Sequence, residues 1–270
     1  MSRNQTGLAK YRRGRKSFVY TPYVPLVTHN LLIHFDANDH NSYSGYNYAR
    51  PKWLNIGTGG ILYNADLSGS NIPATNEGWK IKSFRFFSYA VTIDTDYPLY
   101  NFMRFPHPTA MSGDFTYCAW INTFKRVSDS LAEPHIMFII SAKTTNANSY
   151  FGIGINNNNK LSYLDSSPTG NNITLHSTQS VNAGEWNFVA VTRNQITGQV
   201  VLYINGSVDT TGTCNVGTLN TTNYLLIGSD TYFPGYTFGG SIGAILGYTS
   251  ILSVDDILRN FESSRRIYTI

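Results

Sequence analysis

The chain has 270 residues, of which 41% are hydrophobic and 13% charged, against about 25% charged residues in an average soluble protein. The apolar fraction excludes a disordered chain, no run approaches the roughly 18 apolar residues of a membrane-spanning helix, and two cysteines are too few for a disulfide framework or a four-ligand metal site. The sequence leaves open one disulfide bridge between Cys118 and Cys214, but we expect two buried free thiols. A chain of this length can form one all-β sandwich without a second domain.

The first 20 residues form a basic arm. It holds six of the 20 basic residues and no acidic one, so the other 250 residues carry 14 basic and 16 acidic residues. The six candidate anchoring residues are Arg3, Lys10, Arg12, Arg13, Arg15 and Lys16. The arm lacks the apolar core of a secretory signal. Such a run is usually solvated, but it can also bind phosphates, act as a nuclear-localisation patch or hold a partner surface. With the Pro-containing connector that follows, it defines residues 1–26, and residues 27–270 form the body.

The body predicts short strands separated by turns. We expect strands at residues 31–37, 84–93, 114–124, 135–142, 149–155, 160–165, 185–193, 199–205, 224–229 and 239–250. In the third of these, alternate residues share one face of the strand, namely Phe115, Tyr117, Ala119 and Ile121. The Asn-rich run at 156–159 and the pair Asn205–Gly206 each predict a tight hairpin turn.

One helix is predicted after the last strand. Ser253 and Asp256 have the spacing of a capping box. Apolar residues then recur at helical spacing, at Val254, Ile257, Leu258 and Phe261. We expect this short helix to pack on the edge of the sandwich.

Four blocks in this order resemble laminin-G-like, concanavalin A-like modules. They are LLIHFDANDHNSYSG (31–45), DFTYCAWI (114–121), GEWNFVAVTRNQITGQVVLYINGSV (184–208) and GGSIGAILGYTSILSVDDILRNFESSRRIY (239–268). The opening block is similar to those of such proteins from phages and large DNA viruses. The resemblance implies a jelly-roll sandwich of two antiparallel sheets, with the strand at 31–36 paired to the strand at 241–248. Residues 84–97 depart from the Phe-Asp-Gly strand that is usual in the family.

The acidic residues do not favour glycoside hydrolysis, which needs two carboxylates about 5–10 Å apart. The four glutamates are Glu77, Glu133, Glu185 and Glu262, and none has an acid two residues away. Asp94 and Asp96 have strand spacing, but a polar strand end before Pro98 explains them. No His-x-His motif occurs, and the six histidines are scattered along the chain. We therefore expect a protein that is not an enzyme.

Calcium is the one cofactor left open, because the resemblance implies that such sandwiches often hold one Ca²⁺ on rim loops. Asp36, Asn38, Asp39 and Asn41 are rich in the oxygen ligands that calcium prefers. Turn chemistry explains these residues without a metal, and the same holds for Asp94 and Asp96. We assign no metal ligand and expect no cofactor.

Two aromatic loops are candidates for glycan or protein contact. The first contains Tyr43, Tyr46 and Tyr48, and the second contains Tyr232, Phe233 and Tyr236. Tyrosine is enriched in protein interfaces, and exposed aromatic rings also stack on sugars. The sequence does not separate these uses.

The leading hypothesis is a non-enzymatic structural protein of a virus particle: a capsid decoration, cement, minor capsid or appendage protein located in the virion. Its partners would be the major capsid protein, other virion proteins or further copies of itself, with the basic arm as anchor; whether the arm also meets nucleic acid is open. The alternative is a carbohydrate-binding, lectin-like module that attaches to host glycans.

Overall fold

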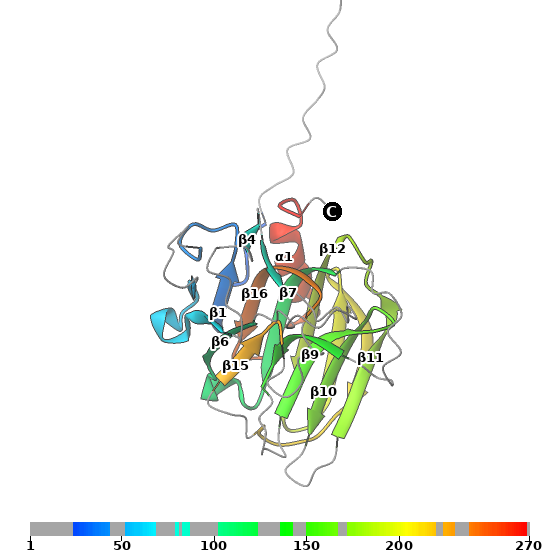
Figure 1. Cartoon of the computed structure of the whole chain (residues 1–270). Coiled ribbons are helices and arrows are strands. Elements are labelled where there is room, and N and C mark those ends of the chain that lie inside the picture. The colour runs from blue at the N-terminus through cyan, green and yellow to red at the C-terminus, as the bar shows by residue number, and fades with distance from the viewer. Residues whose placement is uncertain are drawn as a thin grey trace, which may run out of the picture.

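The computed structural model describes residues 24–43, 52–68, 79–80, 83–86, 102–123, 136–142, 150–166, 172–219, 224–229 and 238–268. In these ranges two antiparallel sheets face each other, and one α-helix lies near the C-terminus (Figure 1). The predicted all-β jelly-roll sandwich is confirmed. No helix in the described ranges has the length and apolar character needed to cross a membrane.

Sheet A contains eight of the described strands. Seven are hydrogen-bonded in the order β14 (Ser207–Thr213), β13 (Gln199–Ile204), β12 (Trp186–Arg193), β7 (Phe115–Thr123), β16 (Gly240–Tyr248), β5 (Ser83–Phe86) and β4 (Trp79–Lys80). The eighth, β1 (Leu31–Asp36), pairs with β16 from Leu31 opposite Tyr248 to Asp36 opposite Ala244. The predicted pairing of the opening and closing strands is therefore confirmed.

Sheet B also contains eight described strands. Their order is β11 (Asn172–Ser180), β10 (Lys160–Ser166), β9 (Tyr150–Asn156), β8 (Ile136–Ser141), β15 (Tyr224–Ile227), β6 (Phe102–Pro106), β3 (Ala65–Ser68) and β2 (Lys52–Trp53). Two short 3₁₀ helices, η1 (Gly60–Tyr63) and η2 (Thr109–Met111), lie in the connections. The strands β2, β3, β4, β6, β11 and β14 were not predicted from the sequence.

Both predicted hairpin turns are present. Asn205 and Gly206 have φ angles of 49° and 81° between β13 and β14, and positive φ at both central residues is what a two-residue hairpin with the twist of the strands requires. Between β9 and β10, the Asn156 Oδ1 accepts hydrogen bonds from the backbone N–H groups of Asn158 (2.9 Å) and Lys160 (3.0 Å). The Asn side chain thus replaces a backbone partner in the turn.

The main core fills the space between the sheets. The inward face of β7 carries the four residues predicted from alternation, and all four are buried in one cluster: Phe115, Tyr117, Ala119 and Ile121. Sheet B contributes residues such as Phe151 and Ile153 of β9, and the Phe115 and Phe151 ring centroids are 5.0 Å apart. Burying each such side chain contributes roughly 1.5–3 kcal/mol to folding.

The helix α1 (Val254–Ser264) covers the outer face of sheet A. Its N-cap Ser253 accepts a hydrogen bond from the Asp256 backbone N–H (3.1 Å), so the predicted cap is confirmed. Ile257 and Phe261 pack in a second buried cluster with Trp120 and Phe188, from the central strands β7 and β12. The helix therefore lies on the outer face of sheet A. The expectation that it packs on the edge of the sandwich is wrong.

The predicted apolar stripe of α1 is only half correct. Val254 and Leu258 are 50% and 43% exposed, whereas the buried residues are Ile257, Asn260 and Phe261. Asn260 is the polar residue of this buried face, and both polar atoms of its amide are hydrogen-bonded. Its Oδ1 accepts from the Val27 backbone N–H (3.0 Å), and its Nδ2 donates to the Tyr248 hydroxyl (2.9 Å). Burial of the amide is tolerated because its hydrogen bonds are made.

The carboxylate of Asp209 links the edge strands β14 and β11 of the two sheets. Asp209 on β14, in sheet A, accepts hydrogen bonds from the backbone N–H groups of Thr178 (2.6 Å) and Gln179 (3.0 Å) on β11, in sheet B. An edge strand presents unpaired N–H groups that can recruit other chains. Asp209 occupies two of them and joins the two sheets.

Candidate functional site

The predicted contact residues lie mostly outside the described residues. These are the six residues of the arm, together with Tyr46, Tyr48, Tyr232, Phe233 and Tyr236. Tyr43 is described: it forms a β-bridge with Trp53 and packs, half-buried, against the main core. The role of Tyr43 as a contact for a sugar or a protein stays a prediction.

The candidate calcium loop after β1 is explained by turn chemistry in the structure. Asp36 Oδ1 accepts hydrogen bonds from the backbone N–H and the Nδ2 of Asn38, at 2.8 and 3.1 Å. Asp39 Oδ1 accepts the same pair from Asn41, at 2.8 and 3.0 Å. Each Asp thus holds the residue two positions later. Across the described residues, no group of three or more His, Cys, Asp or Glu side chains could hold a metal ion. Asp94 and Asp96 lie outside them.

The two described glutamates make local contacts. Glu185 Oε2 accepts a hydrogen bond from Asn182 Nδ2 at 3.0 Å, and Glu262 Oε2 lies 2.7 Å from the Arg265 guanidinium. Glu185 is therefore a turn residue, as expected. Glu77 and Glu133 lie outside the described residues.

A serine–histidine pair was not foreseen. Ser162 on β10 and His176 on β11 are register partners, with 2.8 Å between Oγ and Nδ1. Ser162 is completely buried, so its hydroxyl cannot reach a substrate. The contact joins the edge strand β11 to β10.

A buried ion pair anchors the loops at one rim of the sandwich. Arg193 and Asp165 are both fully buried, with 3.7 Å between Nε and Oδ2. The guanidinium donates to the carbonyl oxygens of Gly113, Asn215 and Gly217 at 2.8–2.9 Å. The carboxylate accepts from the Tyr163 hydroxyl (3.1 Å) and from Asn215 Nδ2 (2.8 Å). These bonds hold the loop after β14 against the start of β7, so the cluster is structural.

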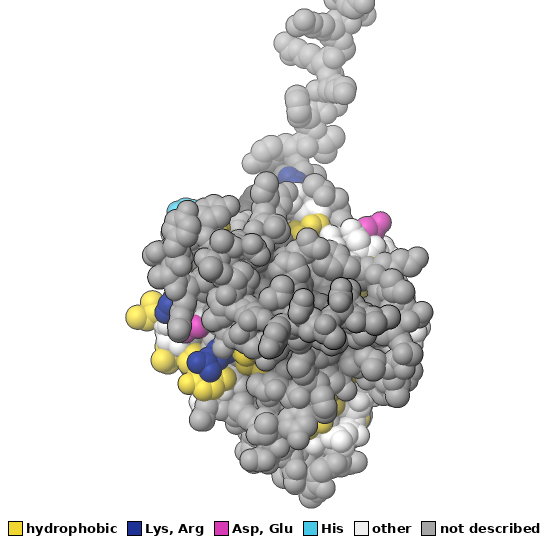
Figure 2. Space-filling model, in the orientation of Figure 1, with side chains coloured by type: hydrophobic (Ala, Val, Ile, Leu, Met, Phe, Trp, Pro, Cys, Tyr) yellow, Lys and Arg dark blue, Asp and Glu magenta, His cyan; other side chains and the backbone are white. Residues whose placement is uncertain are grey.

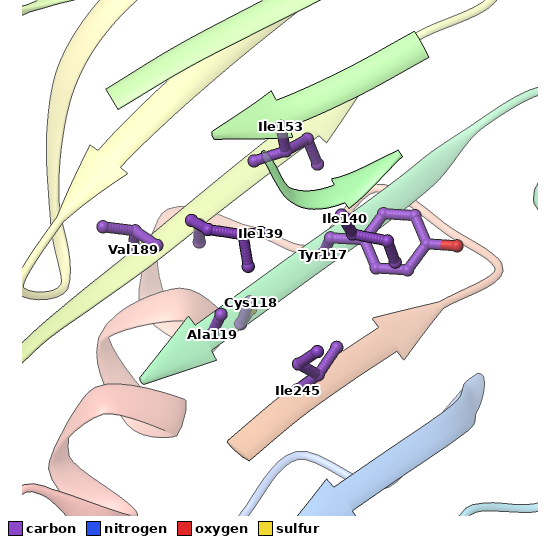
Figure 3. A pocket seen from close by; sticks show the side chains of 9 residues that line it. Tyr117, Cys118, Ala119, Ile139, Ile140, Ile153, Val189 and Ile245 are labelled. Atoms are coloured by element: carbon purple, nitrogen blue, oxygen red, sulfur yellow. The ribbon is translucent and has the colours of Figure 1, made fainter. Parts of the chain in front are cut away.

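The cavity between the two sheets is too small for a ligand. It measures about 10 Å³ and lies between the sheets, lined by Ala119, Ile139, Ile153 and Ile245 among others (Figure 3). Ligand pockets measure about 300–1,000 Å³, and an apolar void near the size of one water stays dry. Both cysteines are free and buried, and burial raises the pKa of each thiol to about 12. Neither is a nucleophile near neutral pH.

The outer face of sheet B presents a polar end. The strand register aligns one row of residues across all eight strands, and residues directly opposite one another share a face. From β2 to β11 the row is Lys52, Asp66, Arg104, Leu226, Ser141, Gly152, Leu164 and Thr174. Leu226 and Ser141, in the middle, are buried. The charged residues of the row gather at the β2–β3–β6 end.

We define the Arg104 cluster as Lys52, Asp66, Arg104 and Tyr224. Lys52 Nζ lies 3.1 Å from Asp66 Oδ1, and both side chains are about half exposed. Arg104 lies directly opposite Asp66 in the register, and its Cζ is 5.2 Å from the centroid of the Tyr224 ring. Tyr224 is 46% exposed. Figure 2 shows basic, acidic and hydrophobic side chains gathered on this side of the molecule, where Figure 1 places β6 and β15.

The Arg104 cluster was missed by sequence reasoning. Residues 224–229 were predicted as a strand, but β6 was not predicted and Tyr224 lies 120 positions after Arg104. The available signal was the alternation in FMRFP, which puts Met103 and Phe105 inward and Arg104 outward.

The two facing sheets, with a helix over one and an exposed polar end on the other, define a lectin-like β-sandwich. A family model, Laminin_G_3, described as concanavalin A-like lectin/glucanases superfamily, matches residues 100–258. This is more than half of the chain, and the chain belongs to this superfamily. No curated protein matches the sequence.

Solved structures are similar at the level of the fold. The binding domain of botulinum neurotoxin serotype D is 17% identical, with a TM-score of 0.57 over 86% of this chain and 51% of that chain. The receptor binding domain of the botulinum neurotoxin C/D mosaic serotype is 17% identical, with a TM-score of 0.54 over 87% of this chain and 52% of that chain. The chain thus spans about half the length of these two. The CBM40 of the Ruminococcus gnavus IT-sialidase bound to α2,3-sialyllactose is 21% identical, with a TM-score of 0.45 over 55% of this chain and 83% of that chain.

Proposed function

We propose that this protein is a carbohydrate-binding module that acts without catalysis and binds glycans at the Arg104 cluster. The superfamily to which the chain belongs is one of lectins and glucanases. The observation that carries the proposal is the exposed Tyr224 ring held beside Arg104 on the outer face of sheet B.

The side chains of the cluster match the chemistry of a sugar. The C–H face of a pyranose ring can pack on the Tyr224 ring, which loses little conformational entropy on binding. Lys52 and Arg104 are hydrogen-bond donors, and Asp66 is an acceptor, for the hydroxyl groups at the sugar's edge. An exposed ion pair contributes only about 0–1 kcal/mol to stability. Folding therefore has little need of these residues.

The Arg104 cluster is exposed, whereas the part of sheet A under α1 is not. On sheet A, α1 covers Trp120 and Phe188, and both side chains are buried. On sheet B, the Arg104 cluster is exposed, while Leu226 and Ser141 in the middle of the same face are buried. The proposed glycan site is therefore the β2–β3–β6 end of sheet B.

The role in a virus particle is the leading hypothesis from the sequence and uses the basic arm as its anchor, but residues 1–23 lie outside the described residues. It stays a prediction, compatible with glycan binding because a particle protein can also bind a host glycan. Its test is density-gradient fractionation of the native source, in which a structural component sediments with particles at a fixed ratio to the shell protein. Recovery in the soluble fraction alone would contradict that role.

The glycan-binding proposal is tested by screening the full chain against an array of neutral and acidic glycans. We expect binding to at least one glycan class, with most of the signal lost in Tyr224→Ala. Leu258→Ala is the matched control, because Leu258 is 43% exposed and lies on α1, over the opposite sheet. Binding to no glycan, or equal binding by Tyr224→Ala and the wild type, would contradict the proposal.

A further inference from the structure

We infer that the Arg104 cluster selects glycans whose contacting sugar carries a carboxylate, such as a sialic or uronic acid. This inference rests on the proposed glycan binding and names the class of sugar bound at the same site. It follows from the charge of the cluster, the orientation of Arg104 and the apolar surface around it.

The cluster has an excess of one positive charge. Asp66 is paired with Lys52, with 3.1 Å between the charged atoms. Among the described residues, the structure records no carboxylate in an ion pair with Arg104; its recorded neighbour is the Tyr224 ring. A neutral sugar would leave the Arg104 guanidinium without an ionic partner. The carboxylate of an acidic sugar would pair with it.

The Arg104 guanidinium is oriented by its neighbours. A cation over an aromatic face is attracted by the negative potential of the ring, so the Tyr224 ring holds the Arg104 guanidinium along one side. The guanidinium is planar, and its donors match the two oxygens of a carboxylate in a bidentate pair. A lysine in the same place would supply charge without this geometry.

Apolar surface surrounds the cation on the same face of the sheet. Phe102 and Pro106 lie two positions before and after Arg104 on β6, so all three side chains point outward. Pro106 is also the register partner of Tyr224. A sugar ring can pack on Tyr224 and Pro106 while its carboxylate reaches Arg104. The cluster thus combines a stacking surface with an anion-binding group.

The same features argue against a highly sulfated polysaccharide. Such a polyanion is held by many cations along its length, and its affinity falls steeply with salt. The described part of the row holds two cations and one carboxylate, beside apolar side chains. A single anionic group per sugar fits this arrangement.

The test uses two pairs of probes that differ in the carboxylate. Isothermal titration compares sialyllactose with lactose, and digalacturonate with galactobiose. We expect the wild type to bind at least one acidic probe about tenfold or more tightly than its neutral partner, because hydrogen bonds to charged groups are stronger than those between neutral groups. Arg104→Gln should remove this difference, and Arg104→Lys should restore part of it.

Arg259→Gln is the matched control, because it removes the same charge from an exposed position on α1. It should keep the preference for the acidic probe. Equal affinity for the acidic and neutral probes, or an acidic preference that survives in Arg104→Gln, would overturn the inference and leave the glycan-binding proposal intact. Tighter binding to heparin than to any carboxylated probe would also overturn it. Failure to bind any probe, and any glycan on the array, would overturn both proposals.

Discussion

Replacing Asp165 by Asn should destabilise the protein strongly. Asp165 and Arg193 are both fully buried, and the change removes one charge while it keeps the shape of the side chain. The carboxylate accepts from Tyr163 at Oδ2 and from Asn215 at Oδ1, so the single amide oxygen of Asn can keep only one of these two sets of bonds. The change therefore removes one accepting oxygen and the charge that compensates the buried guanidinium.

The magnitude follows from the cost of an uncompensated buried charge, which is about 3–5 kcal/mol. The entropy of unfolding is about 2.1 cal/mol/K per residue, or roughly 0.6 kcal/mol/K for 270 residues. The melting temperature should therefore fall by roughly 5–9 °C. The rim loop around Asn215 and Gly217 should exchange its amide protons faster, because Arg193 binds their carbonyl oxygens.

The assay is thermal and urea unfolding followed by circular dichroism. Asp66→Asn is the matched control, since its carboxylate is half exposed and its pairing is worth about 0–1 kcal/mol. The double variant Asp165→Leu, Arg193→Met should recover part of the loss, because apolar residues often replace a buried ion pair without cost. If Asp165→Asn melts within about 2 °C of the Asp66→Asn control, the argument for the buried pair is wrong.

Two further predictions concern pH and the helix. Burial lowers the pKa of His107 to about 4, whereas the pKa of an unfolded histidine is about 6.5. The folded state therefore binds this proton less readily than the unfolded state. The stability of the wild type should decline as the pH falls from about 6.5 to 4. His107→Asn should flatten that part of the curve of melting temperature against pH, and identical curves would refute the assignment. Phe261→Ala should cost about 3–5 kcal/mol because the ring packs on Trp120 and Phe188, whereas the exposed Val254→Ala should cost under about 0.5 kcal/mol in urea unfolding. Equal losses in both variants would contradict the packing of α1 described above.

Strong alternation made the central strands predictable. In β7, every second residue from Phe115 to Ile121 enters the main core, so the local sequence records the buried face directly. The strands β11 and β14 lack this signal, because they lie at the edges and most of their side chains are at least partly exposed. Their pairing is stabilised by contacts such as that of Asp209 with Thr178, which no periodicity predicts.

The site depends on contacts that are remote in sequence. Arg104 meets Tyr224 because β15 pairs with β6, and the register of that pairing is not encoded in either strand alone. The helix shows the same limit: its buried face contains Asn260, whose partners Val27 and Tyr248 come from distant segments. A prediction from the spacing of apolar residues alone therefore placed Leu258 on the buried face of the helix and omitted Asn260 from it.

The most direct test of glycan binding at the Arg104 cluster is an NMR titration of the full chain, labelled with ¹⁵N, with the best ligand from the glycan array. Glycan binding at the cluster should give saturable shifts of the amides of β3, β6 and β15 around Asp66, Arg104 and Tyr224, and should leave those of α1 unchanged. Shifts confined to α1 or to the loop around Tyr43, with no change around Arg104, would contradict it.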